Sequence, residues 1–192
     1  MKDFKVIILM GRSGCGKGTQ AELLRKKFGF GYLSSGDLVR ARMKRDKKLR
    51  EIINQGKLAP TFLISQLWTE KIKEIRDKKN LNCLIIDGSP RTLMEAKLMD
   101  EIFEWYQWSD IKVILLDISD EEAFERLTKR RRFDDKTEAI RSRLDFYKND
   151  VQPAVDYYKK QGRLIKINGQ QSVEKVHRDI IAKVNIWSQL KP

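Results

Sequence analysis

A glycine-rich stretch that directly follows an apolar run constrains this chain more than any other feature. The run covers residues 6–10, and the next ten residues read Gly-Arg-Ser-Gly-Cys-Gly-Lys-Gly-Thr-Gln. Glycines let a backbone curl with its N–H groups facing inward, and the start of a helix adds partial positive charge there. This order of strand, glycine loop, lysine and helix is typical of loops that bind nucleotide phosphates, whereas a merely flexible connection does not require it.

The loop also departs from the usual phosphate-binding pattern. Gly18 stands where a serine or threonine is common, and Thr19 comes one place later. Lys17 is placed to reach the outer phosphates of a nucleoside triphosphate. The residues that we expect to bind these phosphates are Gly11, Ser13, Gly14, Cys15, Gly16, Lys17, Gly18 and Thr19.

Apolar runs that suit buried parallel strands recur along the chain, and a helix-like segment follows each of them. They cover residues 5–10, 83–86, 111–116 and 164–167, with a shorter candidate at 31–33. A helix start is indicated by the capping box Ser119-Asp120-Glu121-Glu122, and another near Asp135 opens a helix that runs through Phe146. The pattern predicts an α/β fold, a doubly wound five-stranded parallel sheet flanked by helices.

Length and composition favour one domain in the cytoplasm. The chain has 192 residues, of which 41% are hydrophobic, enough for one core and too few for two comfortable domains. No apolar stretch approaches the ~20 residues that span a bilayer. The first strand begins within a few residues of the start, which leaves no room for a signal peptide. Cys15 and Cys83 have no spacing typical of a metal site or a disulfide framework.

The net charge is +13, with 40 lysines and arginines against 27 acidic residues. Two basic clusters lie in residues 40–50 and 126–132. Around a phosphate loop, such clusters suit a substrate with several phosphates, although a charge run on a helix is commonly a solvated face. An excess of this size also suits a second hypothesis, a nucleotide-dependent switch protein that associates with RNA.

Three further segments follow the phosphate loop in a fixed order. They read Tyr32-Leu33-Ser34-Ser35-Gly36-Asp37-Leu38-Val39-Arg40, then Gly56-Lys57-Leu58-Ala59-Pro60, then Leu84-Ile85-Ile86-Asp87-Gly88-Ser89-Pro90-Arg91-Thr92. With them the chain resembles the adenylate kinase family, whose segments run approximately S-T-G-D-x-x-R, G-x-L-V-P and D-G-F-P-R-T, with the phosphate loop G-x-P-G-x-G-K-G-T. The resemblance covers nearly the whole chain, and Gly18 fits the family's own loop. Ser13 replaces the family's proline, and Ser89 its phenylalanine.

This resemblance implies a P-loop kinase architecture in one domain, residues 1–192. Within it, residues 34–63 would bind the nucleoside monophosphate and residues 126–136 would form the lid. Only Arg131 separates the positions that match the family's lid arginines Arg130 and Arg132, so we expect a very short lid and a reduced closing motion. The resemblance implies that Arg126, Arg130, Arg132 and Arg143 surround the transferring phosphoryl group, and that Gly169 and Gln170 lie near the donor base.

Arg40 and Arg91 resemble the pair that holds the acceptor monophosphate, since a planar guanidinium meets a phosphate with two parallel hydrogen bonds. The residues expected to act in catalysis are Lys17, Arg91, Arg126, Arg132 and Arg143. Those expected to bind the acceptor nucleotide are Ser35, Gly36, Arg40, Lys57, Leu58, Ala59, Gly88, Arg91, Glu95, Arg132 and Arg143.

The acceptor base is open at this point, because Glu95 replaces the family's glutamine. A carboxylate only accepts hydrogen bonds, which suits guanine's N–H edge or the amino group of adenine. Thr92-Leu93-Met94-Glu95 is also a capping box, so Glu95 could instead bond back to its own helix start. The resemblance implies transfer of the γ-phosphoryl group of Mg·ATP to AMP, with a kinase for GMP or a pyrimidine monophosphate as the alternative.

A magnesium ion is the implied cofactor. Asp87 ends an apolar strand beside the expected site, and its carboxylate suits the waters of a Mg²⁺ that bridges the donor phosphates. Thr19 is a second candidate contact. The expected partners are ATP and a nucleoside monophosphate, with neither a membrane nor a stable nucleic-acid partner, and we expect a monomer.

Overall fold

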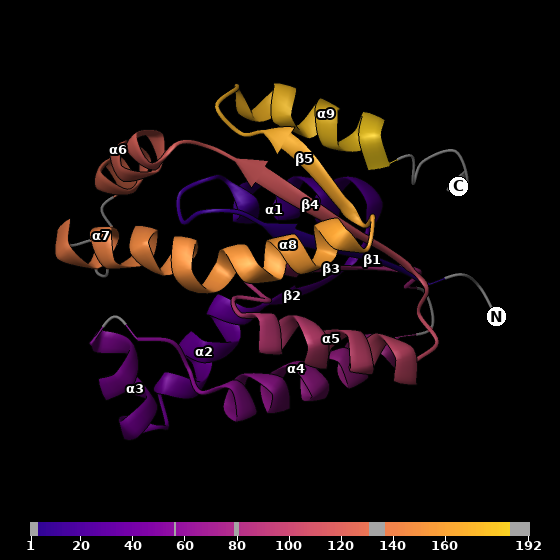
Figure 1. Ribbon diagram of the computed structural model, residues 1–192. Helices are drawn as coiled ribbons and strands as arrows, with labels where there is room; N and C mark the ends of the chain where they lie inside the picture. Colours follow the sequence, from indigo (N-terminus) through magenta and orange to yellow (C-terminus); the bar gives the residue numbers. More distant parts are fainter. Residues whose placement is uncertain (1–3, 56, 79–80, 131–136, 185–192) are drawn as a thin grey trace.

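Five parallel strands lie between helices on both faces in the computed structural model, which describes residues 4–55, 57–78, 81–130 and 137–184 (Figure 1). The strand order is β2-β3-β1-β4-β5. The strands are β1 (Lys5–Met10), β2 (Gly31–Ser34), β3 (Cys83–Asp87), β4 (Asp110–Asp117) and β5 (Leu164–Asn168). The predicted parallel sheet is confirmed, and each strand differs from its predicted range by no more than one residue at either end.

The sheet order explains why these runs are so apolar. All six residues of β1 are buried, because β1 lies in the middle of the sheet with helices on both faces. β3 pairs with one edge of β1 and β4 with the other. The connection that leaves β1 runs toward β2 on one side of the sheet, and the connection that leaves the neighbouring β3 runs toward β4 on the other side. In open α/β sheets, ligands bind outside the carboxyl ends of the strands at such a point.

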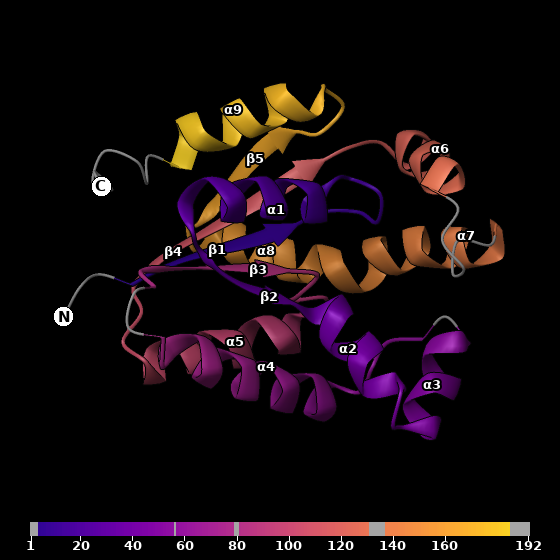
Figure 2. The ribbon, with the colours of Figure 1, turned by 180° about the vertical axis from the view of Figure 1, so that it is seen from behind.

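Side chains of alternate strand residues enter two separate cores. Val6, Ile8 and Met10 pack with α4, α5 and α8, whereas Ile7 and Leu9 pack with α1, α6, α7 and α9. Figure 2 shows α1 and α9 on the face away from α8. The helices on these two faces are α1 (Lys17–Phe28), α4 (Thr61–Arg76), α5 (Leu93–Trp105), α6 (Asp120–Arg130), α7 (Thr137–Phe146), α8 (Gln152–Lys160) and α9 (Val173–Val184).

α7 continues without a break into a π-helix, η1 (Tyr147–Val151), and then into α8. The predicted end of a helix at Phe146 coincides with the end of α7, while its predicted start at residues 135–136 lies outside the described residues. The sequence did not predict η1. Pro153 has no N–H to donate to the preceding turn, and the Gln152 N–H bonds the Tyr147 carbonyl five residues back, which widens the helix.

Two short helices project from the carboxyl end of the sheet. They are α2 (Ser35–Met43) and α3 (Lys47–Asn54), which come between β2 and α4 and lie below α7 in Figure 1. Each begins at a side-chain cap: the Ser34 hydroxyl accepts from the Asp37 N–H, and the Asp46 carboxylate from the Leu49 N–H. Within the described residues, no helix has the length and apolar character to cross a membrane.

Candidate active site

The phosphate loop curves against the end of β4, and the fit excludes any side chain at Gly11. A Cβ at this position would lie 2.4 Å from the Leu116 carbonyl oxygen, and Gly11 has a φ of 136°. Gly14 and Gly16 also have positive φ, and Gly16 is the N-cap of α1. The loop therefore curves tightly between the end of β1 and the start of α1.

Lys17, the first residue of α1, turns back across this loop. Its Nζ donates to the carbonyl oxygens of Gly11 and Arg12, each at 2.8 Å. The ammonium group thus lies inside the curve of the loop and beside the N-terminus of a helix. This combination of fixed N–H groups, helix dipole and mobile cation is suited to the outer phosphates of a nucleotide.

Asp87 lies close to the same loop because strand pairing aligns their ends. Leu9 of β1 is opposite Asp87 of β3, and a Cβ added to Gly18 would lie 3.5 Å from Asp87 Oδ2. The Tyr32 hydroxyl donates to this oxygen at 3.3 Å, and burial, assisted by Asp87, raises the pKa of Tyr32 to about 12. Asp87 therefore faces the start of α1 across space that Gly18 leaves open.

That space fits a hydrated magnesium ion. Mg²⁺ keeps several waters and takes few protein ligands when phosphates supply the others. Asp87 faces the loop at Gly18, and Thr19 is exposed on the first turn of α1. No group of three or more potential metal-ligating side chains occurs among the described residues, so the protein part of the fit rests on Asp87 through water.

Three arginines come together beside Asp87, on the side toward α2. Arg91 Nε donates to the Gly88 carbonyl at 2.8 Å, and a Cβ on Gly36 would lie 3.1 Å from Arg40 Nη1. Burial lowers the pKa of Arg91, and the charges of Arg143 and Arg40 lower it further, while Glu95 and Asp87 oppose this shift. A group of arginines of this kind is suited to bind a dianion such as a monophosphate.

A cavity of about 440 Å³ adjoins this arginine cluster. Four of its lining residues, Lys57, Leu58, Ala59 and Glu95, are among those predicted to contact the acceptor nucleotide. Pro60 and Thr61 also line it and lie within the predicted acceptor-binding region 34–63. The sequence reasoning did not name the remaining lining residues, which are Thr92, Ser142, Phe146 and Asp150. Asp150 belongs to η1, which the sequence did not predict, and no motif marks its position. The cavity therefore brings together residues from the segment before α4, the start of α5, α7 and η1.

Glu95 both caps α5 and lines this cavity. Its Oε2 accepts a hydrogen bond from the Arg91 N–H at 2.6 Å, while Thr92 Oγ1 accepts from the Glu95 N–H at 3.1 Å. Glu95 is 3% exposed, and burial raises the pKa of its carboxyl group, opposed by the hydrogen bond from Arg91. The predicted return of the side chain to the helix start is confirmed, although the bond goes to the residue before the N-cap.

Arg126 connects α6 with the end of β5. Its Nε donates to Glu122 at 2.6 Å and its Nη2 to the Gly169 carbonyl at 2.9 Å. Gly169 has no room for a side chain, since a Cβ would lie 2.8 Å from Ile118 Cγ2. Gln170 follows, its N–H bonded to Asn168 Oδ1. The structure thus brings together three residues that were predicted on the donor side.

Other predicted residues occupy different positions. The Ser35 hydroxyl accepts from Trp68 Nε1 at 3.0 Å, so this side chain faces the core. Cys15 is buried within the loop, Ser13 is half-buried, and Arg130 ends α6 at an exposed position. Arg132 and Gly56 lie outside the described residues, as does most of the predicted lid.

A phosphate loop at the carboxyl edge of a parallel sheet, with an arginine cluster and a cavity beside it, defines the class of the protein: a P-loop enzyme that transfers phosphoryl groups between nucleotides. The family model described as "Adenylate kinase" matches residues 9–163. The chain belongs to the adenylate kinase family, which confirms the resemblance.

Curated relatives agree with this assignment. The protein named "Adenylate kinase" of Chlamydia trachomatis serovar L2 (strain ATCC VR-902B / DSM 19102 / 434/Bu) is 34% identical, over 91% of this chain and 88% of its own. "Adenylate kinase 1" of a Nostoc species is also 34% identical, over 92% of this chain and 96% of its own. "Adenylate kinase" of Caldicellulosiruptor bescii is 29% identical, over 94% and 99%.

Proposed function

We propose that the protein transfers the γ-phosphoryl group of ATP to AMP and so forms two ADP. The observation that supports this most directly is the position of Asp87. This carboxylate faces the phosphate loop at Gly18, and its negative charge also raises the pKa of Arg91. The donor phosphates and the acceptor phosphate would therefore both lie near the Asp87 side chain. The family membership and the names of the relatives agree with the reaction.

In this proposal the donor half of the site consists of the loop, Lys17 and the residues around the end of β5. The loop N–H groups and Lys17 bind the β and γ phosphates, and Arg126 is released from Glu122 and Gly169 to reach them. The donor-binding residues are Gly11, Ser13, Gly14, Cys15, Gly16, Lys17, Gly18, Thr19, Arg126, Arg130, Gly169 and Gln170.

The acceptor half consists of the arginine cluster and the cavity next to it. Arg40, Arg91 and Arg143 hold the monophosphate, and the base enters the cavity between Lys57 and Glu95. Glu95 or Asp150 accepts a hydrogen bond from the amino group of adenine. The acceptor-binding residues are Ser35, Gly36, Arg40, Lys57, Leu58, Ala59, Gly88, Arg91, Glu95, Arg132 and Arg143.

The chemical step needs little covalent participation by the protein. An oxygen of the AMP phosphate attacks the γ-phosphorus of ATP, the bond from this phosphorus to the bridging oxygen breaks, and the leaving ADP keeps the electron pair. Lys17 stabilises the charge that develops on the leaving group, while Arg91, Arg126, Arg132 and Arg143 hold the two nucleotides in line. Bound Mg²⁺, held by Asp87 through water with Thr19 nearby, would neutralise charge on the donor phosphates.

We further propose that residues 34–63 form the acceptor-binding region and residues 126–136 a short lid, in a protein that acts as a cytoplasmic monomer. α2 and α3 belong to the first region, and the end of α6 to the second. A short lid excludes water less well, so some hydrolysis of ATP in the absence of an acceptor is expected.

A coupled assay of ADP formation with Mg·ATP and each of AMP, GMP, CMP, UMP and dTMP tests this function. AMP is expected to give the highest kcat/KM, and Arg91→Ala is expected to lower the AMP-dependent rate by about 10²–10³-fold, as for loss of one preorganised charge contact. Arg178→Ala, an exposed change on α9, serves as the control.

The alternatives give different results in the same series of measurements. A preference for GMP, CMP or UMP would identify a different acceptor, and no acceptor-dependent turnover would contradict the kinase function. Retention on an RNA column at ~150 mM salt, where weak phosphate contacts are screened, would then favour the RNA-associated switch.

A further inference from the structure

Arg12 belongs to the phosphate loop, but its side chain contacts two elements distant in the sequence. Its Nε donates to Asp120 Oδ1 at 2.6 Å, at the start of α6, and its Nη1 lies 3.6 Å from Asp117. Its guanidinium carbon lies 4.5 Å from the centre of the Tyr147 ring, in η1. We refer to Arg12, Asp117, Asp120 and Tyr147 as the Arg12 cluster.

The main chain of the same residue holds Lys17. The Arg12 carbonyl oxygen accepts from Lys17 Nζ at 2.8 Å and from the Cys15 N–H at 3.2 Å. The Arg12 side chain is only 19% exposed. Its guanidinium nitrogens contact the two aspartates, and the plane of the group lies over the Tyr147 ring. Fixing the side chain therefore also fixes the carbonyl that orients Lys17.

Two other members of the Arg12 cluster belong to the helices that carry Arg126 and Arg143. Tyr147 comes one helical turn after Arg143 along the continuous helix from α7 into η1, and it is 4% exposed. Asp120 begins α6, the helix that carries Arg126. The π-helix thus places the buried Tyr147 ring against Arg12 of the phosphate loop. π-Helical segments occur frequently at functional sites.

We propose that Arg12 is a positioning residue. The contacts of its side chain with α6 and η1 fix the positions of Lys17, Arg126 and Arg143 relative to one another. The proposal rests on the proposed function. The family's loop pattern leaves position 12 open and has a proline at position 13, where this chain has Ser13. A proline restricts the backbone, so its replacement removes stiffness that the contacts of Arg12 supply from outside the loop.

Removal of the Arg12 side chain leaves the two carboxylates paired. Lys148 Nζ lies 2.7 Å from Asp120 Oδ2, and Lys166 Nζ lies 2.7 Å from Asp117 Oδ2. Lys148 and Arg12 together lower the pKa of Asp120. Because neither aspartate becomes an isolated charge, we expect Arg12→Ala to fold, and its effect on the reaction can be measured.

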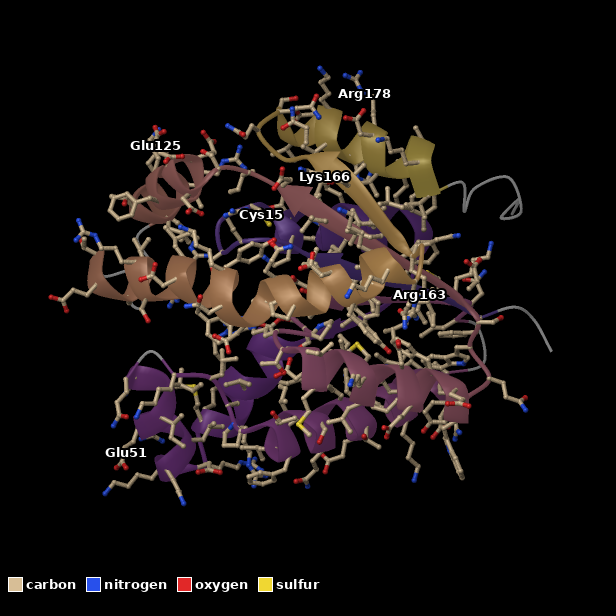
Figure 3. All side chains as sticks on the ribbon, viewed as in Figure 1. Cys15, Glu51, Glu125, Arg163, Lys166 and Arg178 are labelled. Carbon is tan, nitrogen blue, oxygen red and sulfur yellow. The ribbon has the colours of Figure 1, made fainter. Side chains whose placement is uncertain are left out.

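Arg163→Ala is a closely matched control. The Arg163 side chain is 20% exposed, its Nη2 lies 2.5 Å from Asp100 Oδ2, and its guanidinium carbon lies 4.8 Å from the centre of the Tyr158 ring. Both arginines therefore pair with an aspartate and lie over a tyrosine. Arg163 follows α8 and is remote from the phosphate loop that Cys15 marks in Figure 3.

The first measurement is steady-state kinetics with ATP and AMP. Arg12→Ala is expected to lower kcat about 10–100-fold, the effect of a small misplacement of reacting groups, with the KM for AMP changed by less than about threefold. Arg12→Lys keeps the charge but not the planar group and recovers part of kcat. Arg163→Ala is expected to react like the wild type.

The second measurement is amide hydrogen exchange of residues 147–151, which requires ATP binding but no turnover. Saturating ATP is expected to slow exchange there in the wild type and in Arg163→Ala, but not in Arg12→Ala. Wild-type kcat in Arg12→Ala, or retained protection by ATP, overturns the proposal. If Arg12→Ala does not fold, Arg12→Lys gives the same comparison. Absence of turnover with every acceptor would contradict the proposed function, while the exchange result still decides the role of Arg12.

Discussion

Glu95 shows how one side chain can belong to both the fold and the site. Its carboxylate accepts a hydrogen bond from the Arg91 N–H. The Arg91 guanidinium is one of the arginine groups that would hold the acceptor phosphate. The same side chain lines the cavity proposed for the acceptor base. In the proposed function Glu95 would therefore connect recognition of the base with the position of Arg91, a double role that neither the motif nor the capping box predicts by itself.

The pH dependence of stability tests the buried state of Glu95. Because burial raises its pKa, the folded protein binds this proton more tightly than the unfolded chain does. Its contribution is thus most favourable below the ordinary carboxyl pKa and is lost as the pH rises through the folded pKa. Glutamine keeps an acceptor for the Arg91 N–H without ionising, so Glu95→Gln is expected to gain stability relative to the wild type as the pH rises above the ordinary carboxyl pKa of 4.5.

Urea unfolding at a series of pH values measures this difference. Glu125→Gln is the control of opposite sign, since Lys129 lowers the pKa of Glu125 on the exposed surface of α6. A pH-independent difference between Glu95→Gln and the wild type would contradict the expected shift. An increased kcat/KM for AMP in the same variant would indicate that this side chain also faces the base.

At the scale of elements, the strands and the phosphate loop could be predicted from the sequence. Their signals are local: residues 6–10 are uniformly apolar because β1 is buried on both faces, and Gly11 has no room for a Cβ. The capping box at Thr92 is likewise a local pattern. The loop and Asp87 could therefore be placed at one edge of the sheet before any coordinates, whereas the arginine cluster was expected there from the resemblance to the family.

The contacts of the π-helix could not be predicted in this way. Arg12 and Tyr147 are far apart in the sequence, and their contact depends on where a widened helix directs its side chains. Asp150 enters the acceptor cavity for the same reason. Helical periodicity does not describe a π-helix, since one extra residue in the turn shifts every following side chain around the axis.

The start of α5 gives a prediction at the same scale. The Thr92 cap and the Glu95 bond fix the turn that carries Arg91. Thr92→Ala is expected to lower the free energy of unfolding by about 1 kcal/mol and to raise the KM for AMP more than the KM for ATP. Ser172→Ala removes the comparable cap of α9, where Ser172 Oγ accepts from the Lys175 N–H, and is expected to leave the KM for AMP unchanged.

Chemical denaturation and initial-rate kinetics on the two cap variants check this prediction. Both are expected to lose similar stability, because each loses one hydrogen bond at a helix N-terminus. An equal rise of the KM for AMP in both variants would show that general loosening of the protein, rather than the position of Arg91, accounts for the effect.

On the scale of the whole molecule, substrates must bring together the helices around the carboxyl edge of the sheet. α2 and α3 project on one side of this edge, and α6 with α7 on the other (Figures 1 and 2). The Arg12 cluster joins α6 and η1 to the phosphate loop. In contrast, α3 is connected to the sheet through α2 on one side and through the segment that includes residues 57–60 on the other. The acceptor side is therefore the part expected to move.

Distance measurements between pairs of labels test this asymmetry. Glu51 on α3, Glu125 on α6 and Arg178 on α9 are exposed, and each can be replaced by cysteine because Cys15 and Cys83 are buried (Figure 3). With a ligand of two adenosines joined by five phosphates, the 51–125 distance is expected to shorten, while the 125–178 distance stays constant. This expectation accords with the proposal that residues 126–136 form a short lid. A change in the 125–178 distance as large as that between 51 and 125 would contradict this, because it would require α6 to leave the Arg12 cluster.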